Sequence, residues 1–178
     1  MIHYKQLFTQ EECDSIIKLA QSMEDVNWDI VAKKYNGWYF NYCEANSWVY
    51  NRLFEWMKEI TGEIVDLDKL EKNAMESPMF VHRYKKGDFF IRHKDKMPNN
   101  TYYRIYNFGI QLSSDYEGGE LLAWDDHENE YVFPKDTGTA LFYSSEYAHE
   151  VKPITSGERF SFILILDSDY IKKENKLI

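Results

Sequence analysis

The segment Ile91-Arg92-His93-Lys94-Asp95 carries an imidazole and a carboxylate two positions apart. It follows a run, residues 81–90, whose pattern predicts a strand, a turn and a second strand. Residues two apart on a strand point to the same face, so we expect the side chains of His93 and Asp95 to project together. One histidine and one carboxylate are two thirds of the 2-His-1-carboxylate set that commonly holds non-haem Fe(II).

His149, in Tyr147-Ala148-His149-Glu150-Val151, is the best candidate for the missing histidine. It lies on a separate segment that also has the pattern of a strand. A lone histidine is more often an ordinary surface or core residue, and a His-x-Asp triplet is only a hypothesis until its context agrees. The remainder of the chain therefore has to decide whether these three residues form a metal site.

A second possible binding face lies in the run Gly157–Leu164. Strand alternation places Arg159, Ser161 and Ile163 on one face and the apolar residues between them on the other. If the first face lines a cavity, Arg159 offers a planar fork for a carboxylate and Ser161 adds a hydroxyl donor. The alternative is that the apolar face packs on the core while Arg159 is simply solvated.

The composition is that of a globular protein with one domain. The chain has 178 residues, of which 44% are apolar and 29% charged, enough for one core and ordinary in balance. Its net charge of -9 opposes general binding of nucleic acid, which relies on Lys and Arg. The two cysteines, Cys13 and Cys43, indicate no disulfide framework and fit a reducing compartment. No signal peptide or membrane-spanning stretch is evident, so the expected location is the cytoplasm.

A local basic cluster surrounds the candidate site although the chain is acidic overall. Its members are Arg83, Lys85, Lys86, Arg92, Lys94 and Lys96. The cluster is either a solvated strand face or a surface that attracts an anionic cosubstrate or acidic substrate.

Helices and a hairpin are predicted for the first part of the chain. Thr9 and Glu12 form a capping-box pattern at the start of a helix over 9–23. Further helices are predicted over 46–61 and 66–73. The pair Asn36-Gly37 lies between runs rich in aromatic and β-branched residues, which predicts a hairpin turn at this pair.

From residue 78 onward, short runs with the pattern of strands alternate with turn residues. These runs are 79–84, 88–93, 102–112, 119–124, 131–133, 139–143 and 159–166. Many short strands at this spacing favour a sandwich or barrel. We therefore expect one domain over 1–178, with helices and a hairpin in 1–77, a β core in 78–167 and a polar tail in 168–178.

The ordered set His93-x-Asp95, Gly118-Gly119, His149 and Arg159-x-Ser161 resembles the 2-oxoglutarate/Fe(II)-dependent dioxygenases, within them the prolyl 4-hydroxylase-like branch. The resemblance covers Met79 to Leu166 and extends weakly to the first predicted helix. It implies a mainly β fold with supporting α-helices, namely a double-stranded β-helix or cupin-like jelly roll.

The resemblance also implies roles for individual residues. His93, Asp95 and His149 would bind Fe(II). Arg159 would pair with the distal carboxylate of 2-oxoglutarate, and Ser161 would assist. O2 would be the other cosubstrate, with L-ascorbate as a candidate reductant.

Two further residues are candidates for contact with the cosubstrate. Tyr84 matches a position where this branch often places a tyrosine against it, and the alternative for Tyr84 is an aromatic of the barrel wall. Gln111 stands where some relatives carry another tyrosine, a departure that an amide donor could compensate. Collagen-type relatives commonly have lysine in place of Arg159, which weakens an assignment of collagen-like proline as substrate.

The expected function is hydroxylation of an unactivated carbon, with a peptidyl residue, proline first, as the substrate. Hydroxylation of a free amino acid or other small molecule is the alternative. A non-catalytic, ligand-binding jelly roll is a second alternative, and a nucleic-acid demethylase, which the net charge opposes, is a third. The segments 35–42 and 96–101 are expected to border the mouth of the site, and the sequence does not set the oligomeric state.

Overall fold

The computed structural model describes residues 1–72, 79–96 and 103–172. The helices within these ranges are α1 (Gln10–Ala20), α2 (Ser47–Thr61) and α3 (Leu67–Lys72), with the 3₁₀ helices η1 (Glu44–Asn46) and η2 (Ser168–Tyr170). The strands are β1 (Ile2–Gln6), β2 (Asp25–Ile30), β3 (Lys33–Tyr39), β4 (Met79–Tyr84), β5 (Phe89–His93), β6 (Arg104–Gln111), β7 (Tyr116–Gly118), β8 (Leu121–Trp124), β9 (Glu130–Val132), β10 (Thr139–Ser144), β11 (Ala148–Val151), β12 (Ile154–Gly157) and β13 (Arg159–Asp167). The predicted mainly β fold with supporting helices is confirmed.

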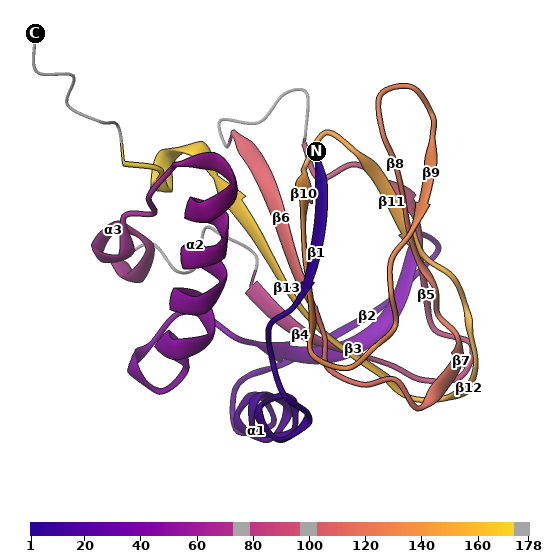
Figure 1. The fold of residues 1–178 in the computed structure, drawn as a ribbon. Helices are drawn as coiled ribbons and strands as arrows, with labels where there is room; N and C mark the ends of the chain where they lie inside the picture. Colours follow the sequence, from indigo (N-terminus) through magenta and orange to yellow (C-terminus); the bar gives the residue numbers. More distant parts are fainter. Residues whose placement is uncertain (73–78, 97–102, 173–178) are drawn as a thin grey trace, which may run out of the picture.

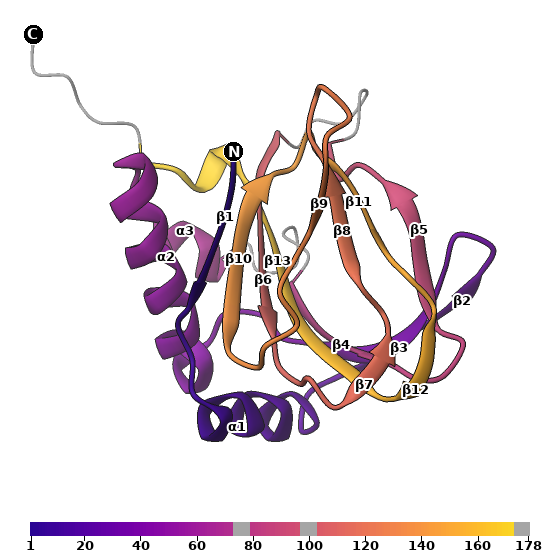
Figure 2. The same cartoon turned by 45° about the vertical axis from the view of Figure 1, so that its right-hand side comes forward.

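In the described part of the chain, eleven strands form one sheet in the order β1-β10-β6-β13-β4-β3-β5-β11-β8-β9, with β2 paired to β3. A separate pair is formed by β12 and β7. The sheet curls so that the arm holding β5, β11 and β8 stands opposite the arm holding β1, β10 and β6 (Figures 1 and 2). This is the expected jelly roll, and its interior is where a site can be enclosed.

Two of the three hydrophobic clusters of the described residues hold the layers together. The larger joins the helices to the outer face of the sheet, and the smaller fills the inside of the curled sheet. Figure 1 shows α1, α2 and α3 on the side of the sheet that carries β1 and β10. The start of α1 carries the predicted capping box, in which Thr9 Oγ1 accepts from the amide of Glu12. None of the described helices is both long and apolar enough to cross a membrane.

The central strand β13 places the residues of the second candidate face beside one another. It pairs with β4 on one side and β6 on the other, both antiparallel. The register sets Arg159 opposite Tyr84, and Ser161 opposite both His82 and Gln111. Residues that are distant in the sequence therefore share one patch of the inner wall.

The predicted hairpin exists, but its turn lies elsewhere. Strands β2 and β3 pair antiparallel from Ile30↔Lys33 outward, so the turn is at Val31-Ala32. Asn36 and Gly37 lie inside β3, and Gly37 also pairs with His82 of β4. Gly37 is needed there because the two backbones approach closely: a Cβ at this position would lie closer than 3.0 Å to the carbonyl oxygen of Val81. The glycine therefore marks a close strand crossing and not a turn.

We predict that Gly37→Ala destabilises the protein strongly. The added methyl meets backbone and cannot be relieved by a rotamer change, so the free energy of unfolding should fall by about 3 kcal/mol. Gly109→Ala is the control, since its nearest contact would be the Leu141 side chain at 3.4 Å, and should cost less than about 1 kcal/mol. Urea unfolding measures both, and equal losses would contradict the crossing argument.

Other boundaries differ more modestly from expectation. Strands β1, β7 and β12 were not predicted, because short polar edge strands have a weak pattern. The expected tail contributes structure: Tyr170 is buried, and Ile171 forms a β-bridge with Val65. The end of the expected polar tail, 173–178, and the start of the predicted run at Tyr102 lie outside the described residues.

Candidate active site

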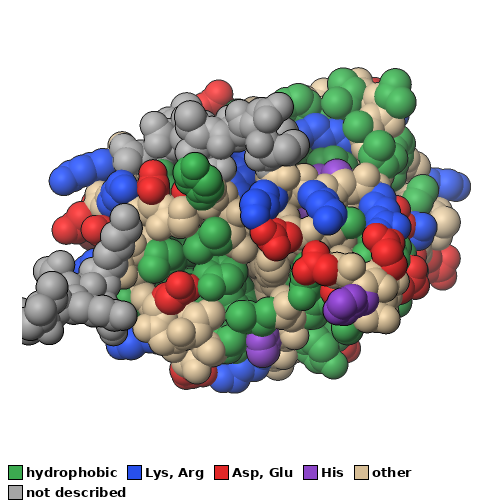
Figure 3. All heavy atoms as spheres, turned by 90° about the horizontal axis from the view of Figure 1, so that it is seen from above, with side chains coloured by type: hydrophobic (Ala, Val, Ile, Leu, Met, Phe, Trp, Pro, Cys, Tyr) green, Lys and Arg blue, Asp and Glu red, His purple; other side chains and the backbone are tan. Residues whose placement is uncertain are grey.

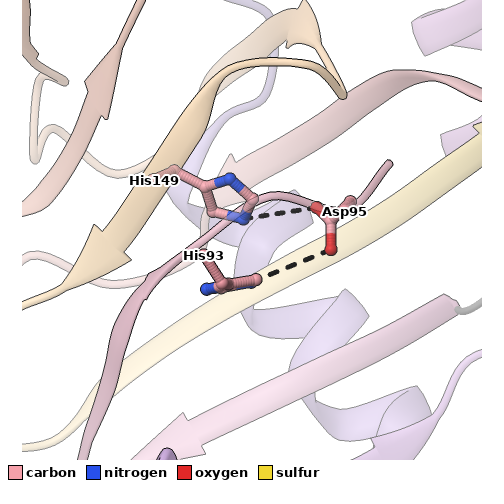
Figure 4. A group of neighbouring side chains, drawn as sticks. All are labelled: His93, Asp95 and His149. Atoms are coloured by element: carbon pink, nitrogen blue, oxygen red, sulfur yellow. Dashed lines mark ion pairs between the residues drawn. The ribbon is translucent and has the colours of Figure 1, made fainter. Parts of the chain in front are cut away.

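Three side chains converge at one end of the barrel interior. Figure 4 shows His93, Asp95 and His149 pointing toward one another from β5, the loop after it and β11. The distance from His93 Nε2 to Asp95 Oδ1 is 3.8 Å, and that from His149 Nε2 to Asp95 Oδ2 is 3.3 Å. One ligand atom from each residue lies within 4.8 Å of the others. The structure thus brings together the three predicted metal ligands, since His149 and His93 are direct cross-strand partners.

Backbone carbonyls orient both imidazoles. Nδ1 of His93 lies 2.8 Å from the oxygen of Ile91, and Nδ1 of His149 lies 3.3 Å from the oxygen of Tyr147. A proton on each Nδ1 is donated to the carbonyl, which leaves Nε2 as a lone-pair donor directed toward Asp95. Burial, with the neighbouring His149, lowers the pKa of His93 to about 4, so this imidazole is neutral near pH 7, as a metal ligand must be.

Asp95 is held by its surroundings and not by strand alternation alone. Strand β5 ends at His93, so Asp95 lies just beyond it. Its Oδ2 accepts from Asn107 Nδ2 at 2.7 Å, and its backbone oxygen accepts from Arg104 Nη1 at 3.2 Å. Hydrogen bonds of this kind fix the orientation of a ligating carboxylate. Asn107 is a supporting residue that sequence reasoning missed, because nothing marked it among the many asparagines.

The triad opens into a cavity of about 420 Å³. Much of its wall is apolar, formed by Phe80, Leu121, Val151, Ile163 and Ile165 among others. An enclosed, largely apolar space with a few convergent polar groups is typical of a small-molecule site.

Arg159 and Ser161 line the same cavity, and Arg159 is only 2% exposed. Its Nη1 donates to Ser161 Oγ and its Nη2 to Gln111 Oε1, each at 3.0 Å. Its Nε is buried without an acceptor, and Arg159 takes part in none of the ion pairs of the described residues. Phe162 and Leu164 on the other face pack in the large core, as the alternation predicted. A buried guanidinium without an anion is costly, so this position favours an anionic ligand.

Gln111 and Tyr84 occupy different positions relative to Arg159. The amide of Gln111 is engaged at both ends, accepting from Arg159 and donating to the oxygen of Pro134 at 3.0 Å. Gln111 therefore orients Arg159, and its direct contact with a cosubstrate stays a prediction. Tyr84 lines the cavity with its ring centre 5.3 Å from the Arg159 guanidinium, a place that suits either role proposed for it.

His82 is a cavity residue that sequence reasoning missed. It is 3% exposed, and its ring centre lies 4.3 Å from that of Tyr35. Burial, aided by the charges of Arg159 and Lys33, lowers the pKa of His82 to about 3 and keeps it neutral. Its Nε2 is buried without a hydrogen-bond partner in the structure. The signal was available, since His82 and Tyr84 are two apart on a predicted strand and so share a face.

The predicted basic cluster divides between the surface and the cavity. Three members form ion pairs on the surface: Arg83 with Glu158, Arg92 with Glu128 and Lys96 with Glu146. Of the six residues only Lys94 lines the cavity, where Lys33 and Arg104 join it. The interpretation as a solvated strand face therefore applies to Arg83, Arg92 and Lys96, which form ion pairs. The alternative interpretation, a surface that attracts an anion, remains for Lys94.

The expected border of the site is correct only in part. Tyr35 lines the cavity, whereas Trp38 and Phe40 are buried in the core on the opposite face. Of the segment 96–101, Lys96 is in a surface ion pair, and the rest lies outside the described residues.

The chain is similar to known oxygenases in both sequence and structure. Residues 79–166 match the model of the 2OG-Fe(II) oxygenase superfamily. A PKHD-type hydroxylase of Idiomarina loihiensis is 32% identical over 108 residues, which cover 54% of this chain and 49% of the relative. A PKHD-type hydroxylase of Prochlorococcus marinus is 28% identical over 181 residues, covering 96% of this chain and 79% of the relative. The match with the first of these thus spans about half of the relative's length.

Solved structures share the fold at low sequence identity. A prolyl-4-hydroxylase of Pseudomonas putida has a TM-score of 0.67 and 15% identity, over 93% of this chain and 91% of that one. A prolyl hydroxylase of Trichoplax adhaerens, in complex with a peptide fragment of the hypoxia inducible factor oxygen degradation domain, has a TM-score of 0.71 and 16% identity, over 94% and 84%. These similarities establish the fold.

Proposed function

We propose that this chain, a member of the 2OG-Fe(II) oxygenase superfamily, is an Fe(II)- and 2-oxoglutarate-dependent hydroxylase of the prolyl 4-hydroxylase-like branch. One observation carries this proposal. Two histidines and a carboxylate meet at the wall of a cavity that also contains a buried arginine, Arg159, with no carboxylate partner among the described residues.

The donor set fits Fe(II). Two neutral imidazoles and one carboxylate, supplied by His93, His149 and Asp95, can occupy one face of an octahedral ion and leave other positions for ligands. When bound there, Fe(II) with 2-oxoglutarate and O2 supplies the oxidant for hydroxylation of an unactivated carbon. The two backbone carbonyls and Asn107 hold the ligands in place.

The inner wall fits 2-oxoglutarate. A guanidinium has five N–H donors, of which Arg159 uses one for Ser161 and one for Gln111. The remaining donors can bind the distal carboxylate of the cosubstrate as a charge-assisted pair. The apolar wall then excludes water from the reacting groups.

The substrate that we propose is a peptidyl residue, proline first. Support comes from the prolyl-4-hydroxylase fold of the Pseudomonas putida protein and from the peptide in the Trichoplax adhaerens complex. A free amino acid or small molecule is the alternative. The free cysteines Cys13 and Cys43 fit our proposal of a reducing, cytoplasmic location. Ascorbate as reductant is a further element of the proposal.

A thermal melt tests the site. We expect the metal-free protein to be folded and to gain stability from Mn(II) and 2-oxoglutarate together, because ligands that bind only the folded state stabilise it. At a hundredfold excess over Kd the gain is about 2.7 kcal/mol, on the order of 5–10 °C for a chain of this size. His93→Ala should lose the part that depends on metal. Identical melting temperatures in all conditions would mean that the site does not bind these ligands, and formation of succinate from 2-oxoglutarate is the matching activity assay.

A further inference from the structure

We propose that Lys33, Arg104 and Lys94 form a cationic rim that binds an anionic group of the substrate, so that the substrate carries a carboxylate near the carbon that is oxidised. This inference rests on the proposed hydroxylase function and specifies its substrate class. The three residues line the triad cavity, and none of them is itself a proposed ligand of iron or of the cosubstrate.

The charge of the cavity is opposite to that of the chain. The net charge of the whole protein is -9, yet the described residues that line the cavity include Lys33, Lys94, Arg104 and Arg159 against a single carboxylate, Asp95. On the face seen from above in Figure 3, Lys and Arg side chains lie beside a histidine that is partly hidden from view. An acidic protein that collects cations in one cavity attracts anions there.

Binding of the cosubstrate does not neutralise the positive charge of the rim. The two charges of Fe(II) and the one of Arg159 balance the two carboxylates of 2-oxoglutarate and that of Asp95. Among the described residues that line the cavity, no further carboxylate is left to balance the three rim cations when the site is loaded. The substrate is the remaining species that reaches the cavity, so it is the natural source of the balancing anion.

Of the three rim cations, Lys33 has the position best suited to bind an anionic group beside the triad. Its Nζ lies 3.7 Å from the centre of the Trp28 ring and 5.2 Å from that of Phe90. Phe90 in turn stacks on His93 with ring centroids 3.8 Å apart, so the ammonium is one aromatic ring away from a metal ligand. Burial lowers the pKa of Lys33, because the ammonium has lost part of its hydration. Among the described residues, no carboxylate lies within ion-pair distance of it.

Arg104 and Lys94 complete the rim next to Asp95. Arg104 donates to the backbone oxygen of Asp95 and forms no ion pair in the described part of the chain. Lys94 is exposed and lies between His93 and Asp95 in the sequence. The hydrogen bond and charge of Lys96, with a smaller contribution from Lys94, lower the pKa of Glu146, and the ion pair of Glu146 is with Lys96. The surface cations Arg83, Arg92 and Lys96 form ion pairs, whereas the three rim cations form none among the described residues. This difference distinguishes the rim from the rest of the basic surface.

The carboxylate could belong to an acidic side chain beside the target residue of a peptide, or to the target molecule itself. Binding of peptide pools distinguishes these sources. The pools have a randomised central residue flanked by Glu, Gln or Lys and have blocked ends, and N-acetylproline is compared with the neutral N-acetylprolinamide. Binding is measured by competition with a labelled Glu-flanked pool on protein loaded with Mn(II) and N-oxalylglycine, an unreactive analogue of 2-oxoglutarate.

We expect anionic probes to bind at least about tenfold more tightly than their neutral counterparts, with the preference reduced at high salt. A preference for the Glu pool assigns the carboxylate to a peptide side chain, and a preference for N-acetylproline over N-acetylprolinamide assigns it to the target itself. Lys33→Met, which keeps an unbranched side chain but removes the ammonium that lies over Trp28, should remove most of the preference, and Lys33→Glu should reverse it. Lys34→Met is the matched control, because Lys34 is exposed and lies beside Asp29.

Two readouts separate this inference from the proposed function. Succinate formation by the wild-type protein without any peptide tests the hydroxylase assignment alone. If succinate forms but no probe binds better in its anionic form, the rim is not a substrate site and the inference is overturned. If succinate does not form, the hydroxylase assignment is overturned, while the binding preference still decides whether the rim selects anions. An unchanged preference in Lys33→Met also overturns the role of Lys33.

Discussion

Replacing Asp95 with alanine is expected to reduce 2-oxoglutarate turnover by about a hundredfold or more, since even the residues that merely support metal ligands cost 10–100-fold when removed. Asp95 is the only carboxylate of the triad, and both histidine Nε2 atoms lie within 3.8 Å of it. Its loss leaves two neutral imidazoles that cannot offset the charge of a divalent ion. Succinate formation and bound iron should fall together, and His149→Ala should behave alike.

The fold should survive this change, because Asp95 lies in a loop beyond β5 and belongs to neither hydrophobic core. Asn107→Ala should give an intermediate loss, since it removes only the hydrogen bond that orients the carboxylate. Asp126→Ala, an exposed aspartate outside the cavity, is the control and should have no effect. Near wild-type turnover of Asp95→Ala with unchanged iron content would refute the ligand assignment.

The ligand positions could be predicted from the sequence because each carries a local signal. Histidine and aspartate two apart after a strand pattern, and Arg-x-Ser on an alternating strand, restrict the direction of each side chain. The pairing of β5 with β11 could not be predicted, because the register between strands distant in sequence depends on the whole sheet. The sequence therefore indicated which residues, and the fold determined that His93 and His149 lie opposite one another.

The misplaced hairpin turn has a physical reason, and it concerns Lys33. Asn36-Gly37 was interpreted as the turn, and Lys33 was given no role at the site. The turn is at Val31-Ala32, so Lys33 begins a strand that pairs with β5 beside the triad. The close approach of β4 that requires Gly37 is a long-range contact, and short-range turn statistics cannot detect it.

Replacing Arg159 with alanine is expected to weaken 2-oxoglutarate binding by about a hundredfold or more while Mn(II) binding stays nearly intact. Each charge-assisted bond contributes about 1.5–3 kcal/mol, and a guanidinium can make two to one carboxylate. Arg159 lies on β13 and contacts none of the triad side chains by hydrogen bond or ion pair among the described residues. The metal and cosubstrate effects should therefore separate in a melt titrated first with Mn(II) and then with 2-oxoglutarate.

Arg159→Lys should be intermediate, because lysine keeps the charge but loses the planar fork that Ser161 and Gln111 hold in place. Arg83→Ala is the matched control. Arg83 lies on the neighbouring strand β4 and pairs with Glu158 at 2.6 Å, and it does not line the cavity. If Arg159→Ala binds 2-oxoglutarate as tightly as the Arg83 variant, the buried guanidinium has another partner and the cosubstrate assignment fails. If Mn(II) binding is lost as well, the two halves of the site are coupled more tightly than the separate strands that carry them suggest.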